Sequence, residues 1–455
     1  MLVFSVVSCF YQPYLEIARQ AKKIKPDIKV VFGGIHATAV PEIVINQPEV
    51  DYVVIGEGDI AFLKILEAVQ NKDFEAPIQN TWFKNPKGDV IKGIQEGFIQ
   101  NLDELPSFDK TPWEEHMRVG DIYYTMTSRG CPFRCTFCCN DLLSKIPEKH
   151  EGAYLRRRSV DHVMQELRTA HSKYKLNWIF FIDDVFTFNK DWLREFAQQY
   201  KNQIGVRFHC YTHPAFFDEE VCEILKSAGC EWMTVGIQTL DEGLKKEYLN
   251  RRETNQQIID TIKIIKKFKI KLTLDFIIGF PKENIENLEI TRNFLKQYTP
   301  NIIQVFYLNM FPGTKLLSIY HDEKIISDDV VDKINNGNGN MLIVSGHHEN
   351  IQGSFNMKQQ KSTNKTYFAY TFIFMLLPLM PKWVRKYLTI KSVRWIPSFF
   401  LQKLRLVSEI SGWIIMRDFR AQALLKHTRY YIARAIRLKF GFKFDPATKV
   451  KKQLK

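Results

Sequence analysis

The stretch SRGCPFRCTFCC spans residues 128–139 and places Cys131, Cys135 and Cys138 at CxxxCxxC spacing. It follows a predicted strand at 122–127, so the three thiols share one loop at a strand end. A [4Fe–4S] cluster takes four ligands, normally cysteine thiolates. Three cysteines on one loop can hold three irons and leave the fourth open, by the logic that separates catalytic from structural zinc sites. The stretch therefore predicts a catalytic cluster on these three cysteines.

Two other interpretations of these thiols stay open, a zinc site and unrelated buried cysteines. Zinc sites usually show two pairs of ligands, and no second pair lies at zinc-like spacing here. Phe137 places a ring beside the point where a small molecule would reach the open iron. Cys139 follows the third ligand directly, and we expect it to be spare and to point away from the iron.

The spacing, with an aromatic residue before the third cysteine, resembles the cluster loop of the radical S-adenosylmethionine (SAM) superfamily. The resemblance implies that a reduced cluster cleaves SAM to a 5′-deoxyadenosyl radical, which removes hydrogen from an unactivated carbon. It also implies an electron donor such as flavodoxin or ferredoxin. The protein would position the reactants and exclude water and oxygen, while the cofactors carry the chemistry.

Six units of a short apolar strand followed by a helix fill residues 121 to about 315. This alternation predicts an α/β fold, an incomplete (β/α)6 barrel like that of a TIM barrel, assigned to 121–325. Barrel chemistry lies at the carboxyl ends of the strands. The cluster loop, Asp183–Asp184, Gln238–Thr239 and Gly279 all fall there.

The resemblance extends over this whole stretch and implies how SAM is held. FIDDVFT resembles the segment that meets the methionine amino group, VGIQT the segment near the ribose, and IIGFP the segment that packs on adenine. Gln238 stands where the family usually has glutamate, which weakens charge-assisted bonding. A solvated acidic strand end is the alternative for the two aspartates. The SAM contacts implied are Phe137, Asp183, Asp184, Gln238, Thr239, Ile278 and Gly279.

Residues 1–75 alternate strands and helices as half of a Rossmann-like domain, with Gly33–Gly34 at a strand end where open α/β sheets bind ligands. VVFGGIHATAVPE followed by DYVVIGEGDIA resembles the cobalamin-binding domain fused to many radical SAM enzymes. The resemblance implies that Gly33 and Gly34 contact cobalamin; a bland turn is the alternative. The chain starts at what resembles the middle of that domain, so we expect an N-terminal truncation. No DxHxxG motif supplies a lower cobalt ligand, and His36 is interpreted as a helix-start or loop residue.

The subfamily implied is the one that carries a cobalamin-binding domain. Its usual outcomes are cobalamin-linked methylation or oxidative cyclisation, so a methyltransferase or a cyclase/oxidoreductase is predicted, with a lipid-like or otherwise hydrophobic small molecule as substrate. Two alternatives remain: a radical SAM enzyme that does not use cobalamin, and a non-catalytic truncated remnant.

The connecting segments show little chemistry. Residues 76–120 are predicted as a linker with a hairpin tip at 85–88, and residues 326–365 as a mobile linker. His347–His348 is interpreted as a surface pair.

Several polar and thiol side chains of the barrel receive structural interpretations. Arg156–Arg158 and Arg207 could bind an anion, but a charged helix start or solvated loop is favoured. For His209 and His213 a structural role is favoured over acid–base chemistry. The cysteines outside the loop are expected to be small buried residues: Cys210, Cys222 and Cys230.

Basic charge is concentrated in the C-terminal tail. Residues 382–455 contain 19 Lys and Arg against three acids, a balance of +16, so the net charge of +14 leaves −2 for the other 381 residues. The tail, 366–455, starts with an uncharged run at 366–381, too short for a spanning helix, which we expect to be interfacial or buried. Basic amphipathic segments follow. They favour peripheral attachment to the inner membrane face over the rival interpretation, nucleic-acid binding.

The remaining composition favours a cytoplasmic enzyme. Eight cysteines without a regular framework indicate a reducing compartment. The N-terminus shows no basic region followed by an apolar one, so no signal peptide is predicted.

Overall fold

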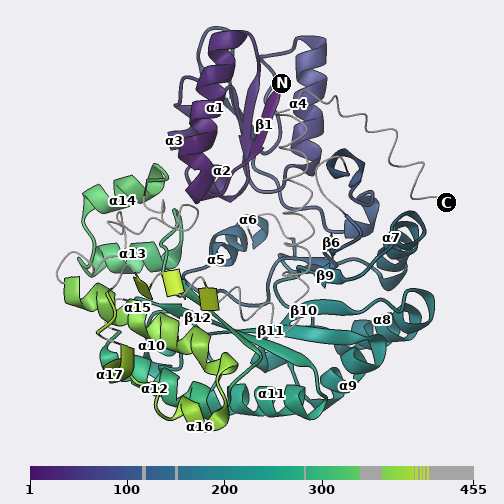
Figure 1. Ribbon diagram of the computed structural model, residues 1–455. Helices are drawn as coiled ribbons and strands as arrows, with labels where there is room; N and C mark the ends of the chain where they lie inside the picture. Colours follow the sequence, from purple (N-terminus) through teal and green to yellow (C-terminus); the bar gives the residue numbers. More distant parts are fainter. Residues whose placement is uncertain are drawn as a thin grey trace, which may run out of the picture.

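The computed structural model describes residues 1–114, 119–148, 152–280, 283–338 and 361–408, apart from positions 394, 398–399, 402 and 405–406. Two sheets organise these residues (Figure 1). The smaller sheet belongs to the N-terminal part, and the larger one carries the barrel.

The first sheet has the order β1-β2-β3-β4-β5. Its first three strands are parallel, as expected for a half Rossmann-like unit, and its last two form an antiparallel hairpin around the predicted turn at 85–88. Within the predicted linker 76–120, residues 81–92 therefore extend this sheet by two strands. The strands are β1 (Leu2–Ser5), β2 (Val30–Gly33), β3 (Tyr52–Val54), β4 (Thr81–Lys84) and β5 (Val90–Lys92). The helices are α1 (Tyr11–Ile24), α2 (Ile35–Ala39), α3 (Pro41–Ile45) and α4 (Asp59–Asn71).

The second sheet is parallel, in the order β13-β12-β11-β10-β9-β6, which confirms the partial (β/α)6 barrel. Its strands are β6 (Tyr123–Thr125), β9 (Ile179–Phe181), β10 (Phe208–Thr212), β11 (Cys230–Gln238), β12 (Lys271–Ile278) and β13 (Ile302–Tyr307). Crossover helices are α7 (Val160–Lys173), α8 (Lys190–Gln203), α9 (Glu219–Ala228), α11 (Asn255–Lys267) and α12 (Ile285–Gln297), with the short α10 (Glu242–Glu247) after β11. The five crossover helices begin at side-chain caps, which accept from the first-turn N–H groups: Ser159, Asn189, Asp218, Thr254 and Asn284.

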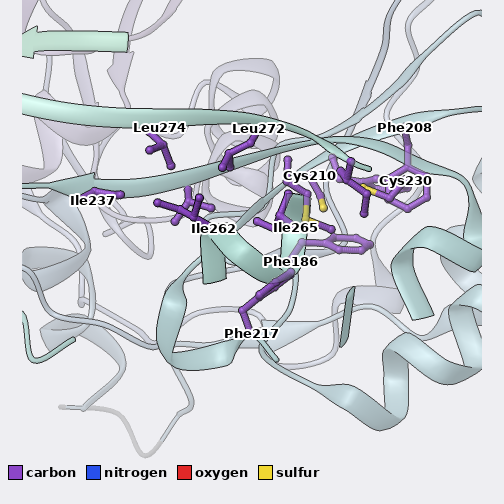
Figure 2. Close-up of a cluster of buried hydrophobic side chains, with 14 of the residues drawn as sticks. Phe186, Phe208, Cys210, Phe217, Cys230, Ile237, Ile262, Ile265, Leu272 and Leu274 are labelled. Atoms are coloured by element: carbon purple, nitrogen blue, oxygen red, sulfur yellow. The ribbon is translucent and has the colours of Figure 1, made fainter. Parts of the chain in front are cut away.

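The main core lies between this sheet and its helices (Figure 2). Alternate strand residues point to it, because side chains along a strand alternate between the two faces. Leu272 and Leu274 of β12 meet Ile262 and Ile265 of α11 in this layer. The predicted buried thiols are confirmed here at 1% exposure or less: Cys210, Cys222 and Cys230.

The loop after β6 starts with a small antiparallel ribbon. It pairs β7 (Ser128–Arg129) with β8 (Arg156–Arg157), and α5 (Cys139–Leu143) and α6 (Lys145–Glu148) lie between these two strands in the sequence. Figure 1 shows α5 and α6 between the first sheet and the barrel.

The C-terminal described segment covers the edge of the barrel. It contains α13 (Lys315–Asp322), α14 (Asp328–Asn335), α15 (Lys361–Leu376), α16 (Lys382–Arg385) and α17 (Ile390–Val393). Helix α15 packs on β13 and α12, and Tyr370, Ile373 and Phe374 are fully buried in it. The buried alternative for the apolar run is therefore confirmed. No helix among the described residues is long and apolar enough to cross a membrane.

The predicted mobile linker at 326–365 is corrected in part, since α14 and the start of α15 are helical. His347–His348 and the basic segments after residue 410 lie outside the described residues.

Candidate active site

The loop of the three cysteines is held from the barrel side through Thr136 at its centre. The Thr136 amide donates to the Leu249 carbonyl at 3.2 Å, and its own carbonyl accepts from the Leu316 amide at 2.9 Å. Its hydroxyl donates to the Tyr248 carbonyl. The segment MFPGTKL at residues 310–316 therefore anchors this loop through Leu316.

The three thiols are free and sit in different electrostatic surroundings. Burial raises the pKa of Cys131 to about 12. Burial also raises the pKa of Cys135 to about 11, although Arg251 opposes it with Nη1 at 4.0 Å from Sγ. A hydrogen bond from the Cys139 thiol outweighs burial at Cys138 and lowers its pKa to about 7.

The donor set fits an iron–sulfur cluster better than a single metal ion. Among the described residues, no three His, Cys, Asp or Glu side chains are arranged to hold one ion. In a cluster, each thiolate binds a different iron, so the sulfurs need not converge on one point. The three free thiols suit such a cluster, and two of their sulfurs have a nearby N–H donor, from Arg251 and from Asn140. The assignment of Cys131, Cys135 and Cys138 as ligands stays a prediction.

Cys139, expected to be spare, has a thiol in contact with Cys138. The Cys139 thiol donates a hydrogen bond to the Cys138 sulfur, and this hydrogen bond raises the pKa of Cys139. The following Asn140 also serves this sulfur: its Nδ2 lies 3.4 Å from Cys138 Sγ and 3.1 Å from Asp184 Oδ2, and its Oδ1 accepts from the Tyr154 hydroxyl. Asn140 therefore links Cys138 to Asp184, a role that nothing in the spacing of the motif indicated.

Asp183 has a different role from the predicted one. It is 1% exposed, and its carboxylate accepts from the Thr127 amide (3.1 Å), the Thr127 hydroxyl (2.7 Å) and the Ser128 hydroxyl (2.5 Å). These donors come from the start of the cluster loop, so Asp183 positions that loop and its predicted contact with SAM is corrected. The Asp184 side chain is exposed at the strand end, but the protein around it partly desolvates the carboxylate, and this desolvation raises its pKa.

The end of β11 is distorted where the ribose contact is predicted. The register with β12 shifts between Gly236 and Gln238, and Gln238 has a positive φ of 67°. The Gln238 amide folds back over Gly236, where a Cβ would lie 2.7 Å from Nε2. Thr239 is buried and its hydroxyl accepts from the Asp241 amide at 3.2 Å, which caps the turn into α10. The ribose contacts stay predictions.

The end of β12 corrects one predicted residue. The Ile278 side chain is 2% exposed and belongs to the core behind the sheet, so it does not face a ligand on the inner side. Ile277 packs with Phe137 in a separate apolar cluster on the cysteine-loop side. Gly279 has a positive φ of 88° and open space where a Cβ would lie, and its amide donates to Glu283 Oε2 at 2.7 Å.

Both barrel histidines have structural partners. His209 Nε2 lies 2.8 Å from the Thr234 hydroxyl, and its ring stacks on Phe180. His213 accepts at Nδ1 from the Ala215 amide, and its Nε2 lies 3.1 Å from Arg251 Nη2. Burial lowers the His213 pKa, which favours the neutral ring.

The first sheet is tied to the cluster loop by an ionic clasp, which we define as Glu57, Asp59, Arg129 and Arg156. Arg156 donates to both Glu57 oxygens at 2.8 and 3.1 Å, and Arg129 to both Asp59 oxygens at 2.8 and 3.1 Å. Arg129 and Arg156 are register partners in the β7–β8 ribbon, and Arg129 lies two residues before Cys131. Sequence reasoning missed this clasp; the acidic GEGD and the basic SRG and RRR were its signals.

The other arginines follow the structural interpretation. Arg158 pairs with the buried Glu166 at 2.6 Å, and Arg157 is enclosed by aromatic rings with Trp192 at 3.9 Å. Arg207 stacks over Trp178 at the surface.

The predicted cobalamin glycines have packing reasons of their own. Gly34 has a positive φ of 86°, and a Cβ there would lie 2.6 Å from the Val6 amide, so only glycine fits. A Cβ on Gly33 would make only ordinary contacts, the nearest at 3.5 Å. His36 lies in the first turn of α2, where its Nδ1 meets the Ser8 hydroxyl at 2.9 Å and burial lowers its pKa to about 4. The parallel sheet is of the type that binds ligands at strand ends, while the glycine contacts stay a prediction.

Comparison with known proteins agrees with both halves of this architecture. A model described as the Radical SAM superfamily matches residues 125–295, and one described as the B12 binding domain matches residues 1–66. An uncharacterized methyltransferase of Pyrococcus horikoshii is 32% identical over 320 residues, which cover 69% of this chain and 67% of that protein. The chain belongs to the radical SAM superfamily.

It falls among the radical SAM proteins that carry a B12-binding domain. An anaerobic magnesium-protoporphyrin IX monomethyl ester cyclase of Rubrivivax gelatinosus is 26% identical, over 68% of this chain and 56% of its own length. The solved cobalamin-dependent radical SAM enzyme OxsB, with aqua-cobalamin and SAM bound, shares the fold with a TM-score of 0.63 at 13% identity, over 98% of this chain and 73% of its own. The methyltransferase TsrM of Kitasatospora setae gives 0.57 at 20% identity, over 70% and 63% of the two chains. The two family models together imply a [4Fe–4S] cluster, SAM and cobalamin as the cofactors.

Proposed function

We propose that this radical SAM enzyme methylates or oxidatively cyclises an unactivated carbon of a hydrophobic substrate, with Cys131, Cys135 and Cys138 as cluster ligands. When bound, the reduced cluster supplies the electron that cleaves SAM to methionine and a 5′-deoxyadenosyl radical. The observation that carries the proposal is the placement of the cysteine loop between the barrel strand ends and the ionic clasp to the first sheet.

The inner face of the barrel supports an apolar substrate. Side chains along a strand alternate between the two faces of the sheet, so residues next to core residues face the inner side of the barrel. On or directly after β6, β9 and β13, four such inward-facing side chains are large, apolar and exposed. Their exposure is 39–47%: Tyr124, Met126, Ile182 and Phe306. They lie on or beside β6 and β13, the two edge strands of the open sheet, and β9, the neighbour of β6. One relative is named as a cyclase of a magnesium-protoporphyrin ester, and a large substrate of this kind would suit the exposed apolar side chains.

The test is anaerobic reconstitution with iron and sulfide, followed by SAM and dithionite, with 5′-deoxyadenosine measured by mass spectrometry. Wild type should bind a cluster and form deoxyadenosine. Cys135→Ala should form none, whereas Cys9→Ala, a free cysteine outside the loop, should behave as wild type. A wild-type protein that binds no iron would overturn the proposal, and a cluster without SAM cleavage would favour the non-catalytic remnant.

Cobalamin use is tested on the same reconstituted protein. Retention of cobalamin through gel filtration, at one equivalent per chain, is expected. Loss of cobalamin with SAM cleavage intact would favour the alternative of a radical SAM enzyme that does not use it.

We also propose peripheral attachment to an anionic membrane through residues 381–407. This segment contains Lys and Arg but no Asp or Glu. Its exposed aromatic side chains include Trp383 at 70%, Tyr387 at 62%, Trp395 at 74% and Phe400 at 55%. Aromatic residues with neighbouring lysines suit an interface of anionic lipid.

Flotation of the full chain with vesicles tests this attachment. Binding to vesicles that contain phosphatidylserine but not to neutral ones is expected, with at least a tenfold loss in the Trp383→Ala/Trp395→Ala double variant. The control is Trp113→Ala, because Trp113 is also exposed but lies far in the sequence from residues 381–407. Equal binding by the double variant, or binding to nucleic acid instead of vesicles, would contradict the attachment.

A further inference from the structure

A buried charged pair lies behind Cys135 on the connection between α10 and α11. Arg251 and Glu253 have side chains that are 5% and 1% exposed, and Arg251 Nε donates to Glu253 Oε1 at 2.6 Å. Burying two charges is costly unless both are paired and hydrogen-bonded.

The connection is rigid, which fixes where the guanidinium points. Lys245 is 1% exposed, and its Nζ donates to the Glu253 carbonyl at 3.1 Å and to Asn255 Oδ1 at 2.8 Å. A capping box at Thr254 then starts α11. Arg251 is therefore held from both sides by main-chain and side-chain bonds.

The guanidinium reaches three elements with separate N–H groups. Its Nη2 donates to the Gly236 carbonyl at 2.7 Å and lies 3.1 Å from His213 Nε2. Its Nη1 lies 4.0 Å from Cys135 Sγ, within the longer reach of sulfur. A permanent cation thus faces a predicted cluster ligand in a water-poor environment, where charges interact strongly.

We infer that Arg251 raises the reduction potential of the cluster as a fixed cationic donor to Cys135, and that Glu253 limits this effect by opposing its charge. The inference rests on the proposed role of Cys135 as a ligand. Reduction adds one negative charge to a cluster, so a nearby cation stabilises the reduced state more than the oxidised state. Hydrogen bonds to the sulfurs and local charge are the means by which proteins set such potentials.

The two members of the pair should therefore shift the potential in opposite directions. The midpoint of the reconstituted cluster, measured by redox titration with electron paramagnetic resonance, should fall in Arg251→Gln. It should rise in Glu253→Gln, because the guanidinium is then left unopposed. Arg252→Gln is the matched control, since Arg252 is the adjacent arginine and is exposed; its midpoint should equal that of wild type. A merely structural role would not produce shifts of opposite sign.

Further variants keep the inference testable if Arg251→Gln does not take up iron. Arg251→Lys keeps the charge and loses the fixed fork of donors, so a smaller fall is expected. Unchanged midpoints in Arg251→Lys and Glu253→Gln, with iron content equal to wild type, would overturn the inference. Weaker SAM binding at an unchanged midpoint would assign Arg251 to SAM instead. Absence of a cluster from wild type would contradict the proposed function and is distinguished by iron and sulfide analysis.

Discussion

Two strands of this molecule end in pairs of acids, and the two ends serve the cluster loop in different ways. After β9, Asp183 is buried and accepts only from neutral donors of the loop itself. After β3, Glu57 and Asp59 are partly exposed and pair with arginines of the β7–β8 ribbon. A buried carboxylate surrounded by short hydrogen bonds fixes local geometry, whereas ion pairs at a partly wet surface join two separately folded sheets.

The largest effect is expected from the buried end. Asp183→Ala leaves the Thr127 amide and the hydroxyls of Thr127 and Ser128 without an acceptor, and each unsatisfied donor costs roughly 1–3 kcal/mol. We expect a loss of about 4 kcal/mol in the free energy of unfolding of the barrel, measured by urea titration of the apoprotein. Asp191→Ala, an exposed position, is the control. A loss below about 1 kcal/mol would show that the loop does not depend on Asp183.

An intermediate effect is expected from the clasp. Glu57→Gln removes the charge that faces Arg156, whose side chain is 4% exposed and would remain buried with a poorer partner. Because Glu57 itself is partly accessible, we expect a loss of about 2 kcal/mol in the free energy of unfolding. Breaking a fully buried ion pair costs more, roughly 3–5 kcal/mol.

The measurement is urea unfolding together with limited proteolysis between the two sheets, where the variant should be cleaved faster. Glu67→Gln breaks an exposed pair with Lys64 and should cost less than about 0.5 kcal/mol. Equal cleavage rates in Glu57→Gln and Glu67→Gln would show that the clasp does not join the sheets.

The smallest effect on stability is expected at Asp184, which is open to solvent. Its pKa is raised in the folded state, so protonated Asp184 contributes stability that is present in acid and lost as the pH rises through the folded pKa. Asp184→Asn should therefore unfold like wild type in acid and be slightly more stable at neutral pH, by at most about 0.5 kcal/mol. Urea titrations of both proteins at two pH values give this comparison, and a variant less stable than wild type at neutral pH would contradict it.

The sequence predicts the fold well because the fold depends on local periodicity. Apolar strands that alternate with amphipathic helices predict the partial barrel, and the uncharged run at 366–381, expected to be interfacial or buried, is buried. The hairpin tip at 85–88 was predicted, but its strands β4 and β5 were not assigned to the first sheet, because short hairpin strands carry a weak pattern.

Site residues were less predictable because their roles depend on which face or partner a side chain meets. Ile278 was placed one residue from the side chain that faces the cluster loop, Ile277, and a one-residue shift along a strand reverses the face. Asp183 and Asp184 are adjacent and chemically alike, and only the three-dimensional contacts separate them. Arg251 and Glu253 lie 116 and 118 positions from Cys135, so no local motif could have joined them to it.

The position of Arg129, two residues before Cys131, makes the first sheet and the cluster loop thermodynamically coupled. If docking of the first sheet restricts the ribbon to the conformation that binds iron, assembly of the cluster must strengthen that docking by the same free energy. Iron uptake and attachment of the first sheet would then report on each other in titrations.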